Sequence, residues 1–415
     1  MTSVLILGGT GFVARNLLSQ LLATPSSPAA ALSPALLHVK VVDKKHPKMQ
    51  HLSQDHSALY DDERVTFAQC DLSRKSMLDK AFSHPSGDAS AKWDLIVNLA
   101  AETANGCSHS TYEARCLNLS KNCVEYASTH LSAPPTLYVE MSTAAVYASQ
   151  NRTPAKEDAQ LSPWTVQAQY KLKAEEAVTE VAHHNTLPLV IFRPAIIYGN
   201  GDKSGLMPRA VAAATYVNTG ESMNFLWDGA LRMNTVHVVD VCRAVVHAYQ
   251  NPSQFSSKIF NLSDCGDSDQ QRVNGYLGEL FGINVGFVGR MLSNVARINM
   301  DGAVEVANEK HLQPWGKLCA ERNIDTVLSP FIHRELLERN HVNVDGSAIS
   351  TSTGFVYQHP ELTPQLLKGM IMDAVETKLF PDVLVSDTIP ESEGKAGEEE
   401  EGEETKIDNT NNFLR

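Results

Sequence analysis

The glycine-rich segment near the start of the chain constrains the fold more than any other part of the sequence. An apolar run at residues 4–7 ends in the turn Gly-Gly-Thr-Gly at 8–11, and apolar residues then recur at helical spacing. This pattern predicts a buried strand, a tight turn and a helix. Gly8 permits the turn, Gly11 lets a ligand approach the backbone, and Ala14 lets helix and strand pack closely. Because the free N–H groups of such a helix favour an anion, the segment predicts a site for the pyrophosphate of a dinucleotide.

Short β-like runs alternate with helical stretches along the first half of the chain. The runs lie at 39–42, 65–67, 95–99, 136–139 and 189–192, and the clearest helical stretches lie at 112–129 and 164–183. Alternation at this spacing predicts βαβ units and a parallel sheet that is covered on both faces. We therefore expect the α/β class, with a doubly wound Rossmann sheet and a smaller C-terminal substrate lobe.

The expected boundaries follow from where this regularity weakens. Residues 1–200 are expected to form an NAD-binding domain, with 236–265 returning to its sheet through a strand at 236–240. Residues 201–386 are expected to form mainly the substrate lobe. Residues 387–415 carry ten Asp and Glu against three Lys and Arg, with few apolar side chains. This last stretch is predicted to be a disordered acidic tail.

Composition narrows the classes of partner and the location. The formal net charge of −13 and the lack of a basic stripe argue against nucleic acid. No apolar run approaches the roughly 18 residues that span a bilayer, and the first residues lack a signal-peptide pattern. Seven cysteines without a CxxC pair argue against a disulfide framework. The sequence has no cluster of His, Cys, Asp and Glu at metal-ligand spacing, which argues against a metal site. We therefore expect a cytoplasmic protein with a small-molecule substrate, no membrane span and no metal.

Acidic residues close the second and third predicted strands. Asp43 follows the run at 39–42, where a carboxylate can accept hydrogen bonds from ribose hydroxyls and repel a 2′-phosphate. This favours NAD over NADP. Lys44 and Lys45 come directly after it and can partly neutralise a phosphate, so NADP stays open as the alternative. Asp71 and Leu72 follow the third strand and suit the adenine edge, although a turn-forming role for the aspartate is the simpler alternative.

Six short segments occur in an order that is typical of one family. They are GGTGFVA at 8–14, NLAAET at 98–103, a helix asparagine at Asn118, STAAVY at 142–147, RPAIIYG at 193–199 and RMNTVHVVD at 232–240. Together they resemble the extended short-chain dehydrogenase/reductases, the NAD-dependent epimerase/dehydratase group, over roughly residues 3–265 and more loosely to about residue 380. The resemblance implies NAD as the cofactor. It implies cofactor contacts from Gly8, Gly11, Phe12, Val13, Asp43, Asp71, Leu72, Leu99, Ala100, Ala101, Asn118, Lys171, Arg193 and Pro194.

The family's chemistry implies a tyrosine four residues before a lysine on one helix, and this chain departs from that pattern. KLKAEE at 171–176 resembles the family's sequence from the lysine onward, which makes Lys171 the lysine and puts Gln167 at the tyrosine position. Glutamine has no ionisable proton near neutral pH. Tyr170 points about 100° away from Lys171 around the helix. A second register, which pairs Gln169 with Lys173, also lacks a tyrosine.

Other side chains near this helix complete the predicted catalytic set. The helix is expected to begin at Ser162, as N-cap, and Pro163. The resemblance implies that Lys171 positions the nicotinamide ribose and that Ser142 and Thr143 orient the substrate oxygen. The proton carrier stays open between Tyr147, Tyr170, Thr143 and a water molecule.

The substrate end is predicted from the segments that follow residue 197. Arg232 resembles the arginine with which nucleotide-sugar members of the family grip a diphosphate, and Arg209 and Tyr198 are candidates to join it. Surface salt bridges are the alternative role for both arginines.

Two functions of different classes follow. One is an NAD(H)-dependent oxidoreductase or epimerase/dehydratase-like enzyme acting on a nucleotide sugar or related polar alcohol. The other, favoured by Gln167, is a non-catalytic dinucleotide-binding regulator or scaffold. The oligomeric state stays open; members of the family often pair through two long helices per subunit, and the candidates for such a homodimer here are the helices at 112–129 and 164–183.

Overall fold

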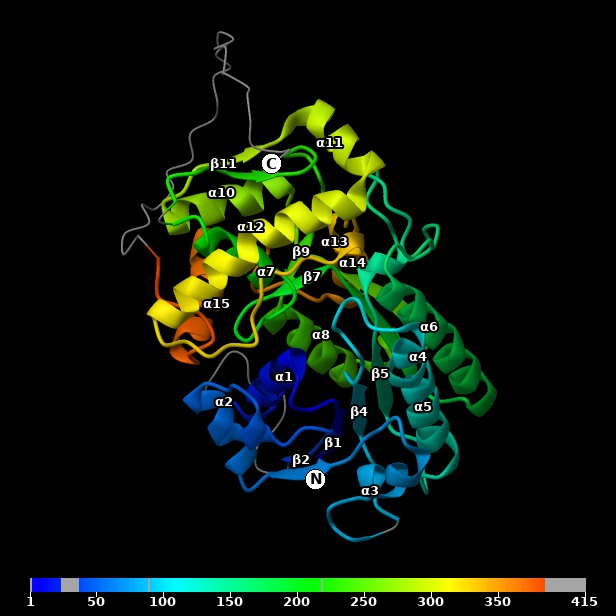
Figure 1. The fold of residues 1–415 in the computed structure, drawn as a ribbon. Helices are drawn as coiled ribbons and strands as arrows, with labels where there is room; N and C mark the ends of the chain where they lie inside the picture. Colours follow the sequence, from blue (N-terminus) through cyan, green and yellow to red (C-terminus); the bar gives the residue numbers. More distant parts are fainter. Residues whose placement is uncertain (1, 24–36, 89, 218, 385–415) are drawn as a thin grey trace.

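The computed structural model describes residues 2–23, 37–88, 90–217 and 219–384 (Figure 1). The predicted acidic tail at 387–415 lies outside the described residues. Within the described part of the chain, no helix is both long enough and apolar enough to cross a membrane.

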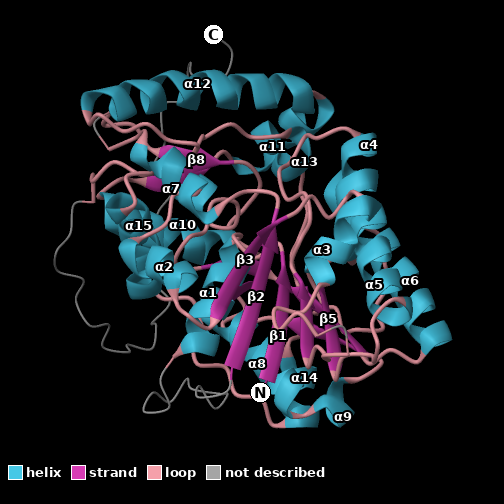
Figure 2. Ribbon diagram, turned by 90° about the horizontal axis from the view of Figure 1, so that it is seen from below, coloured by secondary structure: helices cyan, strands magenta, loops and turns pink. Residues whose placement is uncertain are grey.

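A seven-stranded parallel sheet forms the centre of the molecule, in the order β10-β6-β5-β4-β1-β2-β3 (Figure 2). Its strands are β1 (Thr2–Leu7), β2 (Leu37–Asp43), β3 (Val65–Gln69), β4 (Leu95–Asn98), β5 (Leu137–Met141), β6 (Leu189–Pro194) and β10 (Lys258–Leu262). The chain runs outward in opposite directions from β1, through β2 on one side and β4 on the other. In such sheets, ligands bind at the carboxyl ends of the strands where the order reverses. The predicted doubly wound α/β sheet is confirmed.

Helices cover both faces of this sheet because alternate strand residues are apolar on both sides. Val4 and Ile6 of β1 pack toward α1 (Phe12–Leu22) and α8 (Val238–Gln250). Leu5 and Leu7 face the other way. They share a second cluster with α3 (Leu78–Phe82), α5 (Leu119–Thr129) and α6 (Val166–Asn185). Both faces of the strands are therefore buried, as parallel sheets require.

A second apolar core lies beyond the carboxyl ends of the strands. It is built from α7 (Met207–Ala214), α10 (Gln270–Phe281), α12 (Met300–Glu321) and α15 (Pro364–Glu376). Two small parallel pairs flank it, β8 (Met223–Phe225) with β11 (Val285–Phe287), and β7 (Ile196–Tyr198) with β9 (Thr235–His237). The shorter elements are η2 (Pro47–Met49), α2 (Gln54–Ala58), η3 (Leu59–Asp61), η4 (Lys75–Met77), α4 (His109–Tyr112), η5 (Glu113–Asn118, a π-helix), η6 (Ala144–Val146), α9 (Pro252–Phe255), α11 (Gly289–Ile298), α13 (Arg334–Leu337) and α14 (Ser347–Thr353).

The strand predicted at 236–240 is wrong in both length and place. Only β9 is extended there, it pairs with β7 rather than with the main sheet, and α8 begins at Val238. The imidazole of His237 explains the switch, because its Nδ1 accepts a hydrogen bond from the backbone N–H of Val239 and caps the helix. The strand that rejoins the main sheet is β10.

The chain passes between the two cores more than once. Met233 pairs with Val342, and Ala155 pairs with Val344, in isolated parallel bridges. α14 then packs against β10 of the main sheet, whereas α15, which follows it, packs against α7 and α10. The last described segment therefore fastens both cores to one another.

Acid should destabilise the fold through His237. The residue is 8% exposed, and burial, with His359 beside it, lowers the pKa of His237 to about 3. The unfolded state takes up a proton near the ordinary pKa of 6.5 and the folded state does not, so stability falls as pH drops below 6.5. One such histidine accounts for about 2 kcal/mol between pH 7 and pH 5.

His237→Asn keeps a capping side chain but has no imidazole to protonate. Between pH 7 and pH 5, we expect its free energy of unfolding to fall by about 2 kcal/mol less than that of the unaltered protein. Urea unfolding at pH 7 and pH 5 measures the difference. His183→Asn, at an exposed position of α6, serves as the control. An equal acid loss in all three proteins would contradict the assignment.

Candidate active site

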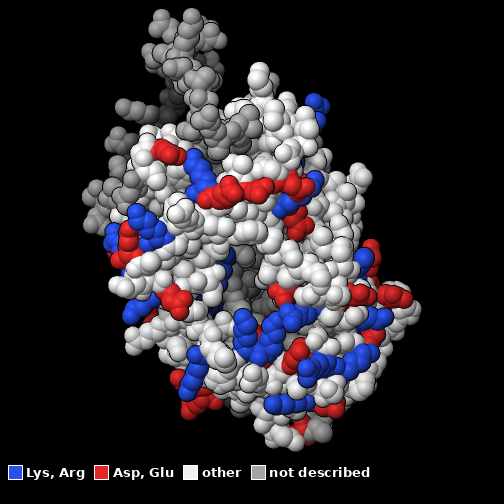
Figure 3. All heavy atoms as spheres, in the orientation of Figure 1, with Lys and Arg blue, Asp and Glu red and all other residues white. Residues whose placement is uncertain are grey.

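A cavity of about 720 Å³ opens at the carboxyl ends of the strands. Its wall includes the glycine turn, the ends of β2, β4 and β5, one face of α6, the loop at 201–205 and the residues Val327, Leu336 and Val342. Figure 3 shows a hollow in this face of the molecule, with lysine and arginine side chains gathered along its lower rim. The cavity thus joins the sheet half to the second core.

The glycine turn lies at one end of this cavity. Gly8 has φ +76°, and a Cβ there would lie 2.6 Å from the backbone Cα of Ala100, so only glycine fits. α1 begins at Phe12 after Gly11, and no side chain caps it. The first-turn N–H groups have no partner within the helix, and Phe12, Val13 and Ala14 line the cavity. The turn can therefore accept an anionic group such as a pyrophosphate.

Carboxylates lie at the next two strand ends and also line the cavity. Asp43 accepts hydrogen bonds from the backbone N–H of Thr10 at 3.0 Å and of Lys45 at 2.9 Å, which fix its orientation. Asp71 accepts bonds from the N–H and hydroxyl of Ser73. Burial works to raise the pKa of Asp71, but the bonds from Ser73 prevail and lower it. Both groups are acceptors for hydroxyl or amine donors of a ligand.

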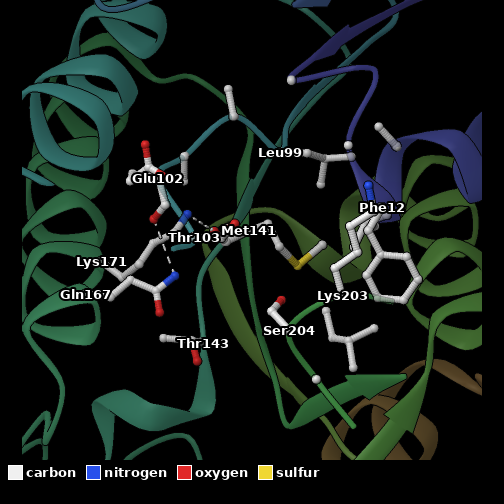
Figure 4. Close-up of a pocket in the computed structure, with 18 of the residues that line it drawn as sticks. Phe12, Leu99, Glu102, Thr103, Met141, Thr143, Gln167, Lys171, Lys203 and Ser204 are labelled. Carbon is white, nitrogen blue, oxygen red and sulfur yellow. Dashed lines mark hydrogen bonds between the residues drawn. The ribbon is translucent and has the colours of Figure 1, made fainter. Parts of the chain in front are cut away.

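Lys171 and Gln167 lie one turn apart on α6 and both line the cavity (Figure 4). The buried amine of Lys171 donates to the backbone carbonyl of Met141 at 2.6 Å, and Gln167 Nε2 donates to the backbone carbonyl of Glu102 at 3.4 Å. Glu140 is fully buried, and burial raises its pKa while the positive charge of Lys171 acts in the opposite direction. Lys171 is thus held at the site by a strand end, with Gln167 beside it.

Tyr170 does not face the cavity. Its ring packs against Tyr112, with centroids 6.1 Å apart, and the amine of Lys173 lies 4.5 Å from its centroid. In the alternative register, Gln169 and Lys173 are both exposed. Among the described residues, no tyrosine is part of the cavity wall.

The helix that carries Lys171 begins later than predicted. Its N-cap is Thr165, whose hydroxyl accepts a hydrogen bond from the N–H of Ala168, and not Ser162. The chain is still extended at Leu161, which pairs with Tyr147, and the N–H of Ser162 donates to Val146. The antiparallel pairing therefore prevents the helix from starting at Ser162.

Five buried polar groups form a network at and behind the cavity wall. The hydroxyl of Ser142 donates to Glu175, and Arg193 forms an ion pair with Glu175 at 2.6 Å. Arg193 also donates to the hydroxyl of Tyr147 at 2.9 Å, and that hydroxyl donates to Asn261. Burial raises the pKa of Tyr147 although Arg193 acts against it. The structure places neither Tyr147 nor Arg193 in the cavity wall, so the expected direct contacts from them are not possible in this conformation.

Four further predicted contacts also lie away from the cavity. Asn118 is exposed, and Tyr198 is fully buried. Arg209 donates to Asn274 and Gln270 of α10, and Arg232 forms an ion pair with Asp267. Both arginines are held by local partners, so neither is available to the cavity in this arrangement.

The remaining predicted residues are brought together. The cavity wall contains Gly8, Gly11, Phe12, Val13, Asp43, Asp71, Leu72, Leu99, Ala100, Ala101, Ser142, Thr143, Lys171 and Pro194. It also contains Arg15, Lys203 and Glu102, which sequence analysis missed. A basic residue in a turn such as NGDKSG carries no signal by itself, because the approach of that turn to α1 is a long-range contact. Among the described residues, no group of three or more His, Cys, Asp or Glu could hold a metal ion.

Comparison with known proteins gives a consistent picture. The sequence matches the NAD dependent epimerase/dehydratase family over residues 4–263, which confirms the predicted resemblance. A comparison with curated protein sequences gives no match.

Solved structures share the fold at low sequence identity. UDP-glucuronic acid 4-epimerase from Bacillus cereus, in complex with UDP-glucuronic acid and NAD, is 14% identical with a TM-score of 0.61, covering 91% of this chain and 100% of that chain. DesIV, a dTDP-glucose 4,6-dehydratase from Streptomyces venezuelae with NAD bound, is 18% identical with a TM-score of 0.62, over 90% and 97% of the two chains. UDP-glucose 4-epimerase from Thermotoga maritima is 15% identical with a TM-score of 0.61, over 91% and 99%. On the match over residues 4–263, the chain belongs to the NAD dependent epimerase/dehydratase family.

Proposed function

We propose that this protein binds NAD(H) in the cavity and catalyses redox chemistry at a hydroxyl-bearing carbon of a small polar substrate, with nucleotide sugars as the leading class. One observation carries the proposal: a single cavity joins the glycine turn to Lys171 and Thr143. The NAD-bound relatives of the same fold support the cofactor, and their UDP- and dTDP-sugar ligands and substrates support the substrate class.

The residues of this chain have separate roles in the proposal. Bound NAD would supply the hydride acceptor. The glycine turn and the free N–H groups of α1 hold the pyrophosphate, and Asp43 accepts hydrogen bonds from the adenosine ribose. Lys171 donates a hydrogen bond to the nicotinamide ribose, and the hydroxyl of Thr143 forms a hydrogen bond with the reacting oxygen of the substrate. Ser142 acts behind them, because its hydroxyl is bound to Glu175.

Proton transfer is the weak point of this site. Gln167 has no group that can act as a general acid or base near neutral pH, and neither Tyr147 nor Tyr170 reaches the cavity. We propose that the proton of the substrate hydroxyl passes to the hydroxyl of Thr143 as Thr143 releases its own proton to a water molecule. The absence of a general acid or base at position 167 typically lowers the rate of the chemical step by about two to four decades.

A non-catalytic dinucleotide-binding regulator is the second candidate. The hydrogen bond from Gln167 to Glu102 favours it, because it occupies the place where the proton carrier is expected. In either case, we propose a cytoplasmic location. A homodimer that pairs through α5 and α6 also remains a proposal.

Thermal unfolding with NAD, NADH, NADP and NADPH, each with and without a panel of nucleotide sugars, tests both candidates. A ligand present at about 100 times its dissociation constant stabilises the folded state by roughly 2.7 kcal/mol. We expect NAD or NADH to give such a shift, and a nucleotide sugar to add a further one. Gly11→Asp should abolish the dinucleotide shift, because the new carboxylate would lie beside the pyrophosphate.

Gly316→Asp is the matched control. It makes the same change at an exposed helix position where a Cβ meets nothing within 4 Å. A shift with the dinucleotide but with no sugar would favour the regulator. No shift with any dinucleotide would reject the proposed function.

A further inference from the structure

Arg15 is a buried cation in the cavity wall with an unused donor. It lies in the second turn of α1 and is 4% exposed. Its Nη2 donates to the backbone carbonyl of Gly201 at 2.6 Å, and its Nη1 donates to the carbonyl of His51 at 3.3 Å. Its Nε is buried and has no hydrogen-bond partner. Arg15 thus keeps one costly buried donor that no acceptor of the described residues satisfies.

Lys203 is a second cation in the same part of the wall. It belongs to the loop at 201–205, is partly buried, and makes no hydrogen bond or ion pair within the described part of the chain. Lys203 and Phe12, the first residue of α1, both line the cavity (Figure 4). Burial lowers the pKa of Lys203 to about 8, helped by the charges of Arg15 and Lys45 and opposed by Asp373.

The acidic groups nearby are already bound elsewhere. Asp202 accepts hydrogen bonds from the backbone N–H groups of residues 204–207. Asp43 accepts from Thr10 and Lys45, and Asp373 of α15 accepts from the backbone of Gly201. None of these carboxylates forms an ion pair with Lys203 in the described part of the chain. The Lys203 ammonium is therefore free to bind an anion at the cavity wall, and the dipole of α1 also favours an anion there.

We propose that Arg15 and Lys203 form a phosphate-binding site that holds the pyrophosphate of the dinucleotide together with the glycine turn. The inference rests on the proposed dinucleotide binding and adds two residues to it. Backbone N–H groups in the first turn of α1 donate to the pyrophosphate. The Lys203 ammonium supplies a charge-assisted hydrogen bond, and the buried Arg15 guanidinium adds positive charge beside it.

This arrangement also gives the second core a part in cofactor binding. Asp373 comes from α15, contacts the loop at Gly201 and lies within the electrostatic reach of both cations. The loop that carries Lys203 is thus supported by a helix from the far end of the described chain.

Calorimetric titration of Lys203→Met with NAD, NADP and adenosine at pH 7 tests the inference. Loss of one charge-assisted hydrogen bond should weaken NAD and NADP binding alike by about 10- to 100-fold, whereas adenosine binding should not change. Lys203→Arg should keep most of the affinity. Lys48→Met is the matched control, because Lys48 is exposed, precedes the wall residue Met49 and does not line the cavity.

The same titrations at pH 7 and pH 9 give an independent readout. The ammonium of Lys203 loses its proton over this interval, so NAD affinity of the unaltered protein should fall with rising pH. Arginine stays charged, and Lys203→Arg should remove most of that dependence. Groups that face Lys203 from other elements, namely Arg15, Lys45 and Asp373, are unchanged in both proteins.

Each result has a definite meaning. If Lys203→Met binds NAD as tightly as the unaltered protein, the inference is wrong while the proposed function stands. A loss confined to NADP would assign Lys203 to a 2′-phosphate and overturn its pyrophosphate role. If the unaltered protein binds neither dinucleotide, the proposed function itself fails.

Discussion

Replacing Arg193 with methionine should lower the free energy of unfolding by about 3–5 kcal/mol. The side chains of Arg193 and Glu175 are 3% and 4% exposed and form an ion pair at 2.6 Å. Without the guanidinium, the carboxylate of Glu175 stays buried with the hydroxyl of Ser142 as its remaining side-chain partner. The hydroxyl of Tyr147 also loses a donor. Urea unfolding followed by circular dichroism measures the loss.

Two further variants separate the buried charge from general disturbance. The double variant with methionine at both Arg193 and Glu175 should recover much of the loss, because it leaves no unpaired charge in the interior. Arg322→Met, at an exposed position after α12, should change stability by less than about 0.5 kcal/mol. Equal losses from Arg193→Met and Arg322→Met would contradict a structural role for the buried pair.

Gln167→Tyr should raise the rate of hydride transfer by about two to four decades. The phenol would lie one turn from Lys171 on the face of α6 that lines the cavity, and the nearby ammonium favours its ionised form. The rate is measured as reduction of bound NAD with the nucleotide sugar that gives the largest thermal shift.

Gln167→Phe is the matched control, since it supplies a ring of similar size without the hydroxyl. The rate of the tyrosine variant should depend on pH, whereas that of the phenylalanine variant should not. Equal hydride-transfer rates for the two variants would show that the phenol hydroxyl has no effect, and would contradict the placement of position 167 at the catalytic site.

The nucleotide half of the fold was open to prediction because its signals are local. An apolar strand, a glycine turn and a helix follow one another at residues 2–22, and Asp43 closes the next strand. Strand ends of a parallel sheet meet at one edge, so local signals were enough to bring Asp43, Asp71 and Thr143 to one cavity.

The substrate half depends on partners that are distant in sequence. Arg209 and Arg232 have the chemistry of phosphate ligands, but side chains of α10 and Asp267 hold them elsewhere. Arg15 has no distinguishing local signal in its helix, and it joins the site only because the loop at 201–205 lies against it. Residue type alone does not decide between such local and long-range contacts.

The passages of the chain between the two cores have a kinetic consequence. The chain crosses between the cores from α7 to α8, from β10 to α10 and again from α14 to α15, so the cores are tied at several separate places. A pair of lobes joined by one linker can swing open like a hinge, but lobes tied in this way cannot separate widely. Ligand exchange is then expected to depend on local movement of the cavity rim, where exposed Val327 and Leu336 lie. The ligand crosses that rim both on entry and on exit, so changes there should alter its association and dissociation rates together.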